Sequence, residues 1–404
     1  MELKIKRRPV NKPKFIRTVG VAAFSGILFG LIAALVFIFV LDGVGYVKEK
    51  NTPAIIIQTE GEETNSGVDD SAKEPNNTRK SDDEVDRKQA LYRTAEAVEK
   101  AVVRINVRMS ESYTGKRGES NVKTGIIFSK NTKMIYCLTT PDAARGLFSV
   151  DVTFSDGTTV EGKVVETDYI SGLSVLKIDA TLLSTSLYDS IIPIEVANSN
   201  KAMPGDLVVA VGNVMGTGVS SLAGAVVSTD GTFSCTDGEL LMIETDIPSR
   251  TNTNGFLINE EGMMVGVISH GADVSGQVNM INAYGCSDLT TTIYKLTEGS
   301  HFPYMGIKTK TIDYKMAGVY GVPLGVFVSL VEVDSPALEA GFQQGDIIVA
   351  AGETAVLSGR RLHSLLMGVN LDKSSERNIT FRVLRLVEGE YETKDISVTL
   401  MDRY

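Results

Sequence analysis

A loop rich in hydroxyl side chains separates two apolar stretches in the second half of the chain, within TDIPSRTNTNGFLINEEGMMVGVIS at 245–269. A hydroxyl in such a strand-turn-strand can attack a carbonyl carbon when an imidazole takes its proton and a carboxylate orients that imidazole. The chain has three histidines, His270, His301 and His363, and none of them precedes the loop. Because triads occur in different chain orders, His270, which follows this segment, stays open as a base. The residue types therefore raise acyl transfer as the chemistry to check, and they leave open whether the chain is a hydrolase or the remains of one.

The elements that must position this loop are predicted to be β-strands. From about residue 102 to 285, short apolar runs such as VRINVRM, LSVLKID and MMVGVIS alternate with turns rich in Gly, Asp and Asn. This spacing predicts an all-β barrel or a pair of barrels, which we assign to residues 89–298. The C-terminal part changes to mixed α/β, with strands at GVFVSLVEV, DIIVAAGE and NITFRVLRL and a helix near GRRLHSLLMGVN. It predicts a second, smaller domain at 300–402.

The N-terminal part has the pattern of a membrane anchor. Residues 1–17 are rich in Lys and Arg, and residues 18–41 contain no charged side chain. At 1.5 Å per residue the apolar stretch reaches roughly 35 Å, enough to cross a hydrocarbon core of about 30 Å. We predict a retained transmembrane helix, because the apolar part of a cleaved signal peptide, which is the alternative, is shorter. The basic flank predicts that the chain crosses the cell membrane once, with its N-terminus in the cytoplasm and its folded domains on the extracytoplasmic side.

Residues 42–88 are predicted to form a disordered linker. From residue 58 onward this segment holds many acids and no aromatic side chain, so it cannot bury enough surface to order itself. Its like charges extend it and hold the following domain away from the membrane.

Composition argues against several classes of partner. The net charge of -10 disfavours nucleic acid or an anionic membrane surface as the main partner, because phosphate binding needs clustered Lys and Arg. Three cysteines, Cys137, Cys235 and Cys286, lie far apart without a CxxC pair, so we expect no zinc site and no other cofactor. We interpret them as small buried apolar side chains rather than as a disulfide, since an odd number cannot pair completely.

Several longer stretches together resemble one family. AMPGDLVVAVGNVMGTG, SGLSVLKID and TNGFLINEEGMMVGVIS are similar to landmark sequences of the HtrA/DegP-type trypsin-like serine proteases, and VDSPALEAGFQQGDIIVAAGE is similar to the signature of their C-terminal PDZ domain. The resemblance covers residues 90–400. It implies a mainly β chain with a trypsin-like double β-barrel and an α/β PDZ domain, following the predicted transmembrane helix. It also implies serine endopeptidase activity and assembly into trimers through the protease domains.

The resemblance places the family's catalytic triad on residues that do not fit its roles. The histidine position in YCLTTPDAA falls on Asp142, the aspartate position in GLSVLKI falls on Gly172, and the serine position in TNTNGFLIN falls on Thr253. Without a base, Thr253 keeps the weak nucleophilicity of a free alcohol, and a carboxylate such as Asp142 is a poor base for an alcohol at neutral pH. The oxyanion loop falls on Thr251, Asn252 and Thr253, where a β-branched residue replaces a glycine. We therefore expect a catalytically degenerate member.

A peptide site is predicted in the PDZ domain. YMGIKTK at 304–310 resembles the loop with which PDZ domains bind a terminal carboxylate, which makes Tyr304, Met305, Gly306 and Ile307 candidate peptide-binding residues. Gly306 would let successive N–H groups converge on one carboxylate, and the following strand would offer its edge to a peptide. The alternative is that these residues form an ordinary strand and turn.

Two further side chains leave alternatives open. His363, or its neighbour Arg361, would read peptide side chains from the predicted helix, and the alternative is a solvated helix residue. Phe256 lies next to the predicted nucleophile loop, where we expect it to fill the core rather than to contact substrate.

These features predict a membrane-anchored, extracytoplasmic pseudoprotease that binds peptides or unfolded-protein C-termini through its PDZ domain. One alternative is an active HtrA-type serine endopeptidase in envelope protein quality control. Another is a regulatory subunit that pairs with an active homologue, so both a homo-trimer and a hetero-oligomer are expected forms of assembly.

Overall fold

The computed structural model describes residues 81–108, 122–140, 149–215, 218–249, 253–268 and 280–403. Among the helices of these residues, none is long and apolar enough to cross a membrane. The predicted transmembrane helix at 18–41 lies outside the described residues and stays a prediction, as does the linker up to residue 80.

The first described element is helix α2 (Ser81–Glu99). It overlaps residues 81–88, the last part of the segment that the sequence analysis assigns to the linker. Leu91, Ala95 and Val98 have the spacing of one helical face and are buried in the same core as residues of the second barrel.

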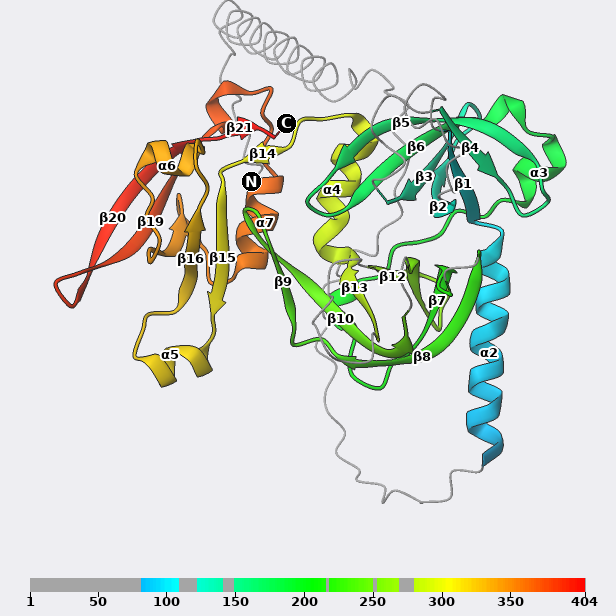
Figure 1. Ribbon diagram of the computed structural model, residues 1–404, viewed down its shortest axis with the longest axis horizontal. Helices are drawn as coiled ribbons and strands as arrows, with labels where there is room; N and C mark the ends of the chain where they lie inside the picture. The colour runs from blue at the N-terminus through cyan, green and yellow to red at the C-terminus, as the bar shows by residue number, and fades with distance from the viewer. Residues whose placement is uncertain are drawn as a thin grey trace, which may run out of the picture. The chain divides into compact units, whose positions relative to one another are not determined.

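The first barrel is closed, with the strand order β1-β2-β3-β6-β5-β4 and β4 pairing back to β1 (Figure 1). Its strands are β1 (Val102–Arg108), β2 (Val122–Lys130), β3 (Met134–Thr139), β4 (Ser149–Thr153), β5 (Thr159–Asp168) and β6 (Leu173–Asp179). Inward-facing aliphatic side chains such as Ile105, Ile127 and Ile178 fill its centre. Short helical turns, η2 (Ala180–Leu182), α3 (Thr185–Ser190) and η3 (Ser199–Lys201), lead to the second barrel.

The second barrel is a seven-stranded sheet in the order β13-β12-β11-β7-β8-β10-β9, which an additional β13–β10 pairing closes. Its strands are β7 (Leu207–Asn213), β8 (Ser220–Ser228), β9 (Thr232–Cys235), β10 (Gly238–Pro248), β11 (Asn254–Asn259), β12 (Met264–Ile268) and β13 (Met280–Gly285). Phe256 is buried in the core, as expected. Cys137, Cys235 and Cys286 are free and buried, which confirms their interpretation as small apolar side chains.

Helix α4 (Cys286–Glu298) leads from this barrel to the C-terminal domain, where Gly299 ends it in the left-handed conformation. The main sheet there has the order β15-β16-β17-β19-β20, so β15 lies at its edge. The strands are β14 (Pro303–Tyr304), β15 (Ile307–Ile312), β16 (Gly325–Val331), β17 (Ile347–Ala351), β18 (Thr354–Ala355), β19 (Asn378–Val387), β20 (Glu390–Thr399) and β21 (Met401–Asp402). The helices are α5 (Tyr314–Tyr320), α6 (Pro336–Ala340), α7 (Gly359–Met367) and η4 (Ser374–Glu376).

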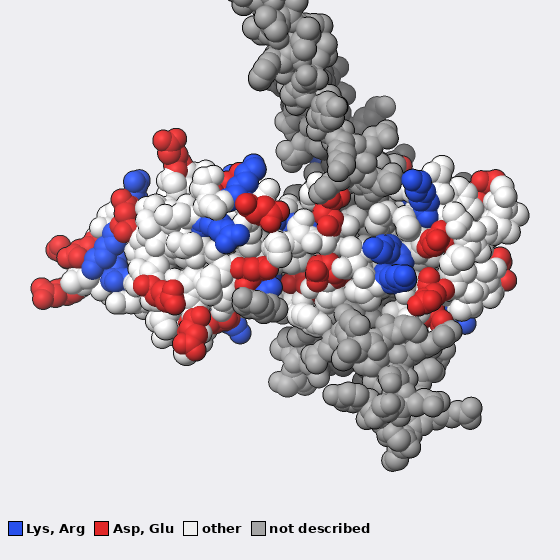
Figure 2. Space-filling model, turned by 90° about the horizontal axis from the view of Figure 1, so that it is seen from above, with Lys and Arg blue, Asp and Glu red and all other residues white. Residues whose placement is uncertain are grey.

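Charged side chains of the described residues are of mixed sign where Figure 2 shows them, with Lys and Arg interspersed among Asp and Glu. Such mixing is typical of a solvated surface and does not single out a polyanion as a partner.

Candidate functional site

Thr253 lies directly before β11 and is buried, with 6% of its surface exposed. Its hydroxyl Oγ1 donates a hydrogen bond to the Val214 carbonyl oxygen at 3.0 Å. Gly212 in β7 and Gly255 in β11 face one another, and a Cβ on Gly255 would stand 2.3 Å from the Val211 carbonyl oxygen. Two adjacent glycines therefore let β7 and β11 approach closely and hold Thr253 against the chain that follows β7.

Neighbours of the three predicted triad positions lie close together. Thr139 at the end of β3 pairs with Ser174, two residues after Gly172. The Thr139 hydroxyl donates to the Thr124 carbonyl oxygen at 3.0 Å, and the Thr124 N–H donates to Oδ1 of Asn254 at 3.1 Å. Asn254 follows Thr253 directly, so hydrogen bonds across the two barrels connect β2, β3 and the start of β11.

Some of the predicted positions lie outside the described residues, namely Asp142, Thr251, Asn252 and His270. Gly172 is described, and it lies in the turn before β6 with a φ of 68° and no atom within 4 Å of where a Cβ would stand. A glycine offers no carboxylate at this point, although the space for one is open.

Both described histidines contact other side chains, and both lie in or next to the C-terminal domain. Nδ1 of His301 pairs with the carboxylate of Asp402. Nδ1 of His363 on α7 faces Sγ of Cys235 at 4.0 Å. The Thr253 hydroxyl donates to the Val214 carbonyl oxygen, and a backbone carbonyl does not act as a general base.

The predicted carboxylate loop does surround a carboxylate, and that carboxylate belongs to Asp237 of the same chain. The N–H of Met305 donates to Asp237 Oδ2 at 2.8 Å, and the N–H groups of Gly306 and Ile307 donate to Oδ1 at 2.7 and 3.0 Å. Gly306 has a φ of 88°, and a Cβ there would stand 2.3 Å from Cβ of Ser335. Glycine is therefore required for the turn that aims these N–H groups at one point.

The side chain of Tyr304, the first residue of this loop, points to another group. Its hydroxyl donates to Oε2 of Glu332 at 2.8 Å, and burial together with this hydrogen bond raises the pKa of Tyr304. Tyr304 thus braces the loop by a side-chain contact, while its neighbours present the N–H groups.

Asp237 is fully buried, and the sequence analysis did not identify it. Burial raises the pKa of Asp237, while the three N–H groups and Arg403, whose Nη2 lies 3.8 Å from Oδ2, act in the opposite direction. The residue has a φ of 66° at the turn between β9 and β10, a conformation that Asp tolerates better than most residues. The pair Asp237-Gly238 is a turn signal in the sequence, but it does not indicate what the turn contacts.

His363 is not a solvated helix residue, because only 2% of its surface is exposed. A Cβ on Gly238 would stand 2.5 Å from Cβ of His363, so the β9–β10 hairpin lies directly against α7. Burial lowers the pKa of His363 to about 4, and the imidazole is therefore neutral at physiological pH. Arg361, the other candidate on this helix, is exposed.

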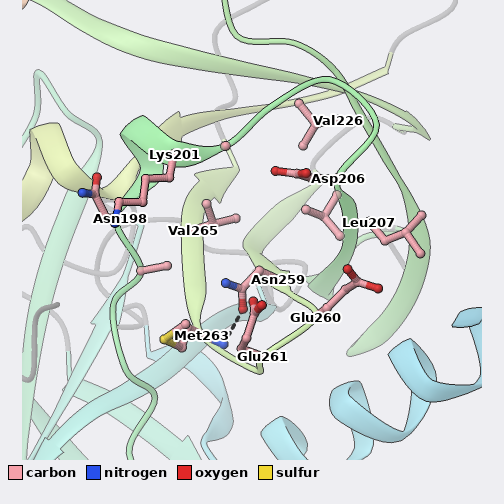
Figure 3. Close-up of a pocket in the computed structure, with 13 residues that line it drawn as sticks. Asn198, Lys201, Asp206, Leu207, Val226, Asn259, Glu260, Glu261, Met263 and Val265 are labelled. Atoms are coloured by element: carbon pink, nitrogen blue, oxygen red, sulfur yellow. Dashed lines mark hydrogen bonds between the residues drawn. The ribbon is translucent and has the colours of Figure 1, made fainter. Parts of the chain in front are cut away.

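A pocket of about 380 Å³ lies elsewhere in the second barrel, between η3, β7 and the β11–β12 turn (Figure 3). Its lining includes Asp206, Glu260 and Glu261 and none of the predicted site residues. Asp206 accepts a hydrogen bond from the Met203 N–H, and Asn259 accepts one from the Met263 N–H, so both side chains stabilise local turns.

Comparisons with known proteins agree with this architecture. Residues 123–267 match the family model of a trypsin-like peptidase domain, and residues 303–400 match that of a PDZ domain. The two domains that the sequence predicts, with a mainly β fold, are thereby confirmed.

Similar curated relatives are bacterial serine proteases. The putative serine protease HhoB of Synechocystis sp. is 28% identical over 59% of this chain and 58% of its own length. The serine protease Do-like HtrA of Lactococcus lactis subsp. lactis is 27% identical over 72% of this chain and 73% of its own length. This chain therefore spans less than two thirds of the first of these relatives.

Solved structures show the same fold. The HtrA-type protease AlgW with tripeptide has a TM-score of 0.56 at 21% identity, covering 78% of this chain and 97% of that chain. The serine endoprotease from Yersinia pestis has a TM-score of 0.52 at 23% identity, covering 79% of this chain and 98% of that chain. At these identities the likeness describes the fold alone.

Proposed function

With the trypsin-like peptidase domain and the C-terminal PDZ domain of an HtrA-type protease established, we propose that this chain binds peptide or unfolded-protein C-termini without cleaving them. The barrels then act as a scaffold, and the PDZ domain supplies the binding site.

The observation that carries this proposal is the carboxylate loop. Three successive N–H groups, those of Met305, Gly306 and Ile307, converge on the two oxygens of one carboxylate. Backbone N–H groups arranged in this way form an anion-binding concavity, and the edge strand β15 begins at the same point. A peptide that ends in a free carboxylate and pairs with β15 uses both features.

The state of the barrel supports binding without cleavage. The hydroxyl of Thr253 donates to the Val214 carbonyl oxygen, and Gly172 carries no carboxylate. Removal of a complete triad costs on the order of a million-fold in turnover in a protease of this mechanism. A chain with Thr253, Gly172 and Asp142 in the three positions is expected to behave in the same way.

We also propose that the N-terminal helix at 18–41 anchors the protein and leaves both folded domains on the extracytoplasmic side. Support comes from the uncharged stretch and its basic flank. The acidic linker then gives the domains reach from the membrane surface.

A binding measurement with matched peptides tests the peptide site. The full chain is titrated against a fluorescein-labelled decapeptide with the sequence of residues 228–237 carrying Asp237→Val, followed by fluorescence anisotropy. We expect a free terminal carboxylate to bind at least about tenfold more tightly than the C-terminal amide, because the amide loses charge-assisted hydrogen bonds to the loop.

The control pair uses two glycines. Gly306→Ala introduces a Cβ into Ser335 at a positive φ and is expected to abolish the preference for the free carboxylate, whereas Gly318→Ala on α5 meets no atom within 4 Å and is expected to keep it. Equal binding of the acid and the amide to the wild-type chain and to Gly318→Ala would refute the proposed peptide site.

A further inference from the structure

The tip of the β9–β10 hairpin of the second barrel contacts the edge of the main sheet of the PDZ domain. Its tip pairs with β15: the Asp237 N–H donates to the Ile307 carbonyl oxygen at 2.7 Å, and Thr236 forms an antiparallel bridge with Lys308. The hydroxyl of Ser234 donates to the Thr309 carbonyl oxygen at 2.9 Å. The tip of the hairpin therefore lies at the free edge of β15, where an added peptide strand would begin to pair.

The hairpin also contacts the helix on the other side of the groove. Cys235 lies against His363 on α7, and Gly238 lies close to both His363 and the Gly359 carbonyl oxygen. A Cβ on Gly359 would stand 2.6 Å from Cγ of Glu239. Both walls of the groove, β15 and α7, are thus in contact with the hairpin.

Polar contacts fix the register of the hairpin along the groove. Glu239 accepts hydrogen bonds from the Thr311 N–H and hydroxyl at 2.8 and 2.6 Å. The Thr236 hydroxyl donates to Oε1 of Glu332 at 2.9 Å, the same carboxylate that accepts the Tyr304 hydroxyl. The hairpin is thus hydrogen-bonded to every second residue from the start of β15, namely Ile307, Thr309 and Thr311.

Asp237 takes the place that a terminal carboxylate would occupy. Its side-chain oxygens accept all three N–H groups of the loop, and its left-handed backbone turns the chain away into β10. A C-terminal peptide has no such continuation, so the side-chain carboxylate substitutes for the α-carboxylate that an internal segment lacks.

We propose that the β9–β10 hairpin, residues 232–239, is an internal ligand that closes the peptide groove of the PDZ domain and that an external C-terminus must displace. The inference rests on the proposed function in one respect, namely that the groove between β15 and α7 binds external peptides. The three loop N–H groups and the edge of β15 cannot serve both ligands at once, so the two compete. Because the hairpin is tethered, its effective concentration at the groove is high, and it reduces the apparent affinity for any free peptide.

The first test removes the charge of the internal ligand. Asp237→Asn in the full chain keeps the shape of the side chain but weakens its bonds to the loop, and we expect the labelled decapeptide described above to bind at least about tenfold more tightly. Asp230→Asn, an exposed residue in the turn before β9, changes the same charge and is expected to leave the affinity unchanged.

The second test strengthens the internal ligand. Facing residues of antiparallel strands have Cα atoms about 4.5–5.5 Å apart, within the range of a disulfide. Thr236→Cys with Lys308→Cys, in a Cys235→Ser background, should therefore lose peptide binding when oxidised and recover it on reduction. This variant keeps the hairpin in place, so it also answers the objection that Asp237→Asn unfolds the domain.

Hydrogen exchange measures occupancy of the groove without any peptide. The amides of Met305, Gly306 and Ile307 should be protected in the wild-type chain and exchange faster in Asp237→Asn. Unprotected amides, or equal peptide affinity in the wild-type, Asp237→Asn and oxidised double-cysteine chains, would overturn the internal ligand. Protected amides that Asp237→Asn releases, with no peptide binding to any variant, would instead keep the internal ligand and refute the peptide-binding function.

Discussion

The hydroxyl of Thr253 and the carboxylate of Asp237 are both held by backbone groups of other segments. The Thr253 hydroxyl donates a hydrogen bond to a carbonyl oxygen, which is too weak a base to take up the proton during an attack. Asp237 accepts three N–H groups, which is the arrangement expected for binding an anion rather than for moving a proton. The individual residues therefore indicate a site that binds a carboxylate rather than one that transfers a proton.

His363 gives a pH dependence to stability. Burial, the largest cause, lowers its pKa from the ordinary 6.5 to about 4, while Asp168 and Asp288 raise it and Arg403 lowers it. Between pH 4 and 6.5 the unfolded chain binds the His363 proton more readily than the folded chain does. The folded state is therefore at its full stability with respect to His363 above pH 6.5, and this stability is lost as the pH falls toward 4.

When the pH is lowered from 6.5 to 4, we expect the free energy of unfolding of the wild-type chain to fall by on the order of 3 kcal/mol more than that of His363→Gln. Urea unfolding at a series of pH values measures both curves, and carboxylates common to both chains cancel in the difference. Parallel curves would show that His363 is not held neutral by burial.

The close packing of two strands, rather than contact with a catalytic group, fixes the position of Thr253, the residue at the predicted nucleophile position. The Gly212–Gly255 approach brings β7 and β11 closer than any side chain would allow. It fixes Thr253 against the Val214 carbonyl oxygen, so the contact follows from how the two strands pack.

Gly255→Ala tests this approach. A Cβ would stand 2.3 Å from a carbonyl oxygen, and we expect a loss of about 3 kcal/mol or more in the free energy of unfolding. Gly157→Ala, in the β4–β5 turn, also has a positive φ but meets no atom within 4 Å, and it should cost only about 1–2 kcal/mol. If urea unfolding gives equal costs for the two variants, close strand approach is not the reason for Gly255.

Sequence periodicity predicted most of these elements and missed those whose role depends on long-range contacts. Alternating apolar residues indicated the barrel strands, and Gly306 indicated a turn that aims N–H groups at a carboxylate. Strand β9 has only four residues, too few for alternation to be informative. That Asp237 supplies the carboxylate could not be predicted, because the turn and the loop are about 70 residues apart and meet only through the tertiary fold.

The PDZ domain and the barrels are joined by more than the hairpin. Arg360 on α7 makes a two-point contact with Asp288 on α4, with Nε–Oδ2 and Nη2–Oδ1 distances of 2.7 and 2.8 Å. Arg403, near the C-terminus, lies 3.2 Å from Asp168 of the first barrel. These charges come from distant parts of the chain, so their pairing was also beyond sequence patterns.

Cooperativity of unfolding follows from these contacts. We expect the described domains of the wild-type chain to melt in one calorimetric transition, because the hairpin, Arg360 and Arg403 couple them. Asp237→Asn with Arg360→Ala should separate a PDZ transition at a temperature lower by roughly 5–10 °C. Arg382→Ala, which removes an exposed ion pair within the PDZ domain, should keep a single transition, and the same splitting in this control would contradict the coupling.

Hydrolysis of fluorescein-labelled casein by the purified full chain, beside Thr253→Ala, is the measurement that bears most directly on binding without cleavage. Equal rates at the background of buffer alone are the expected result, since the Thr253 hydroxyl donates its hydrogen bond to a backbone carbonyl and Gly172 supplies no carboxylate to orient a base. Steady release of fluorescence by the wild-type chain that Thr253→Ala abolishes would contradict the account and assign the protein to the active endopeptidases.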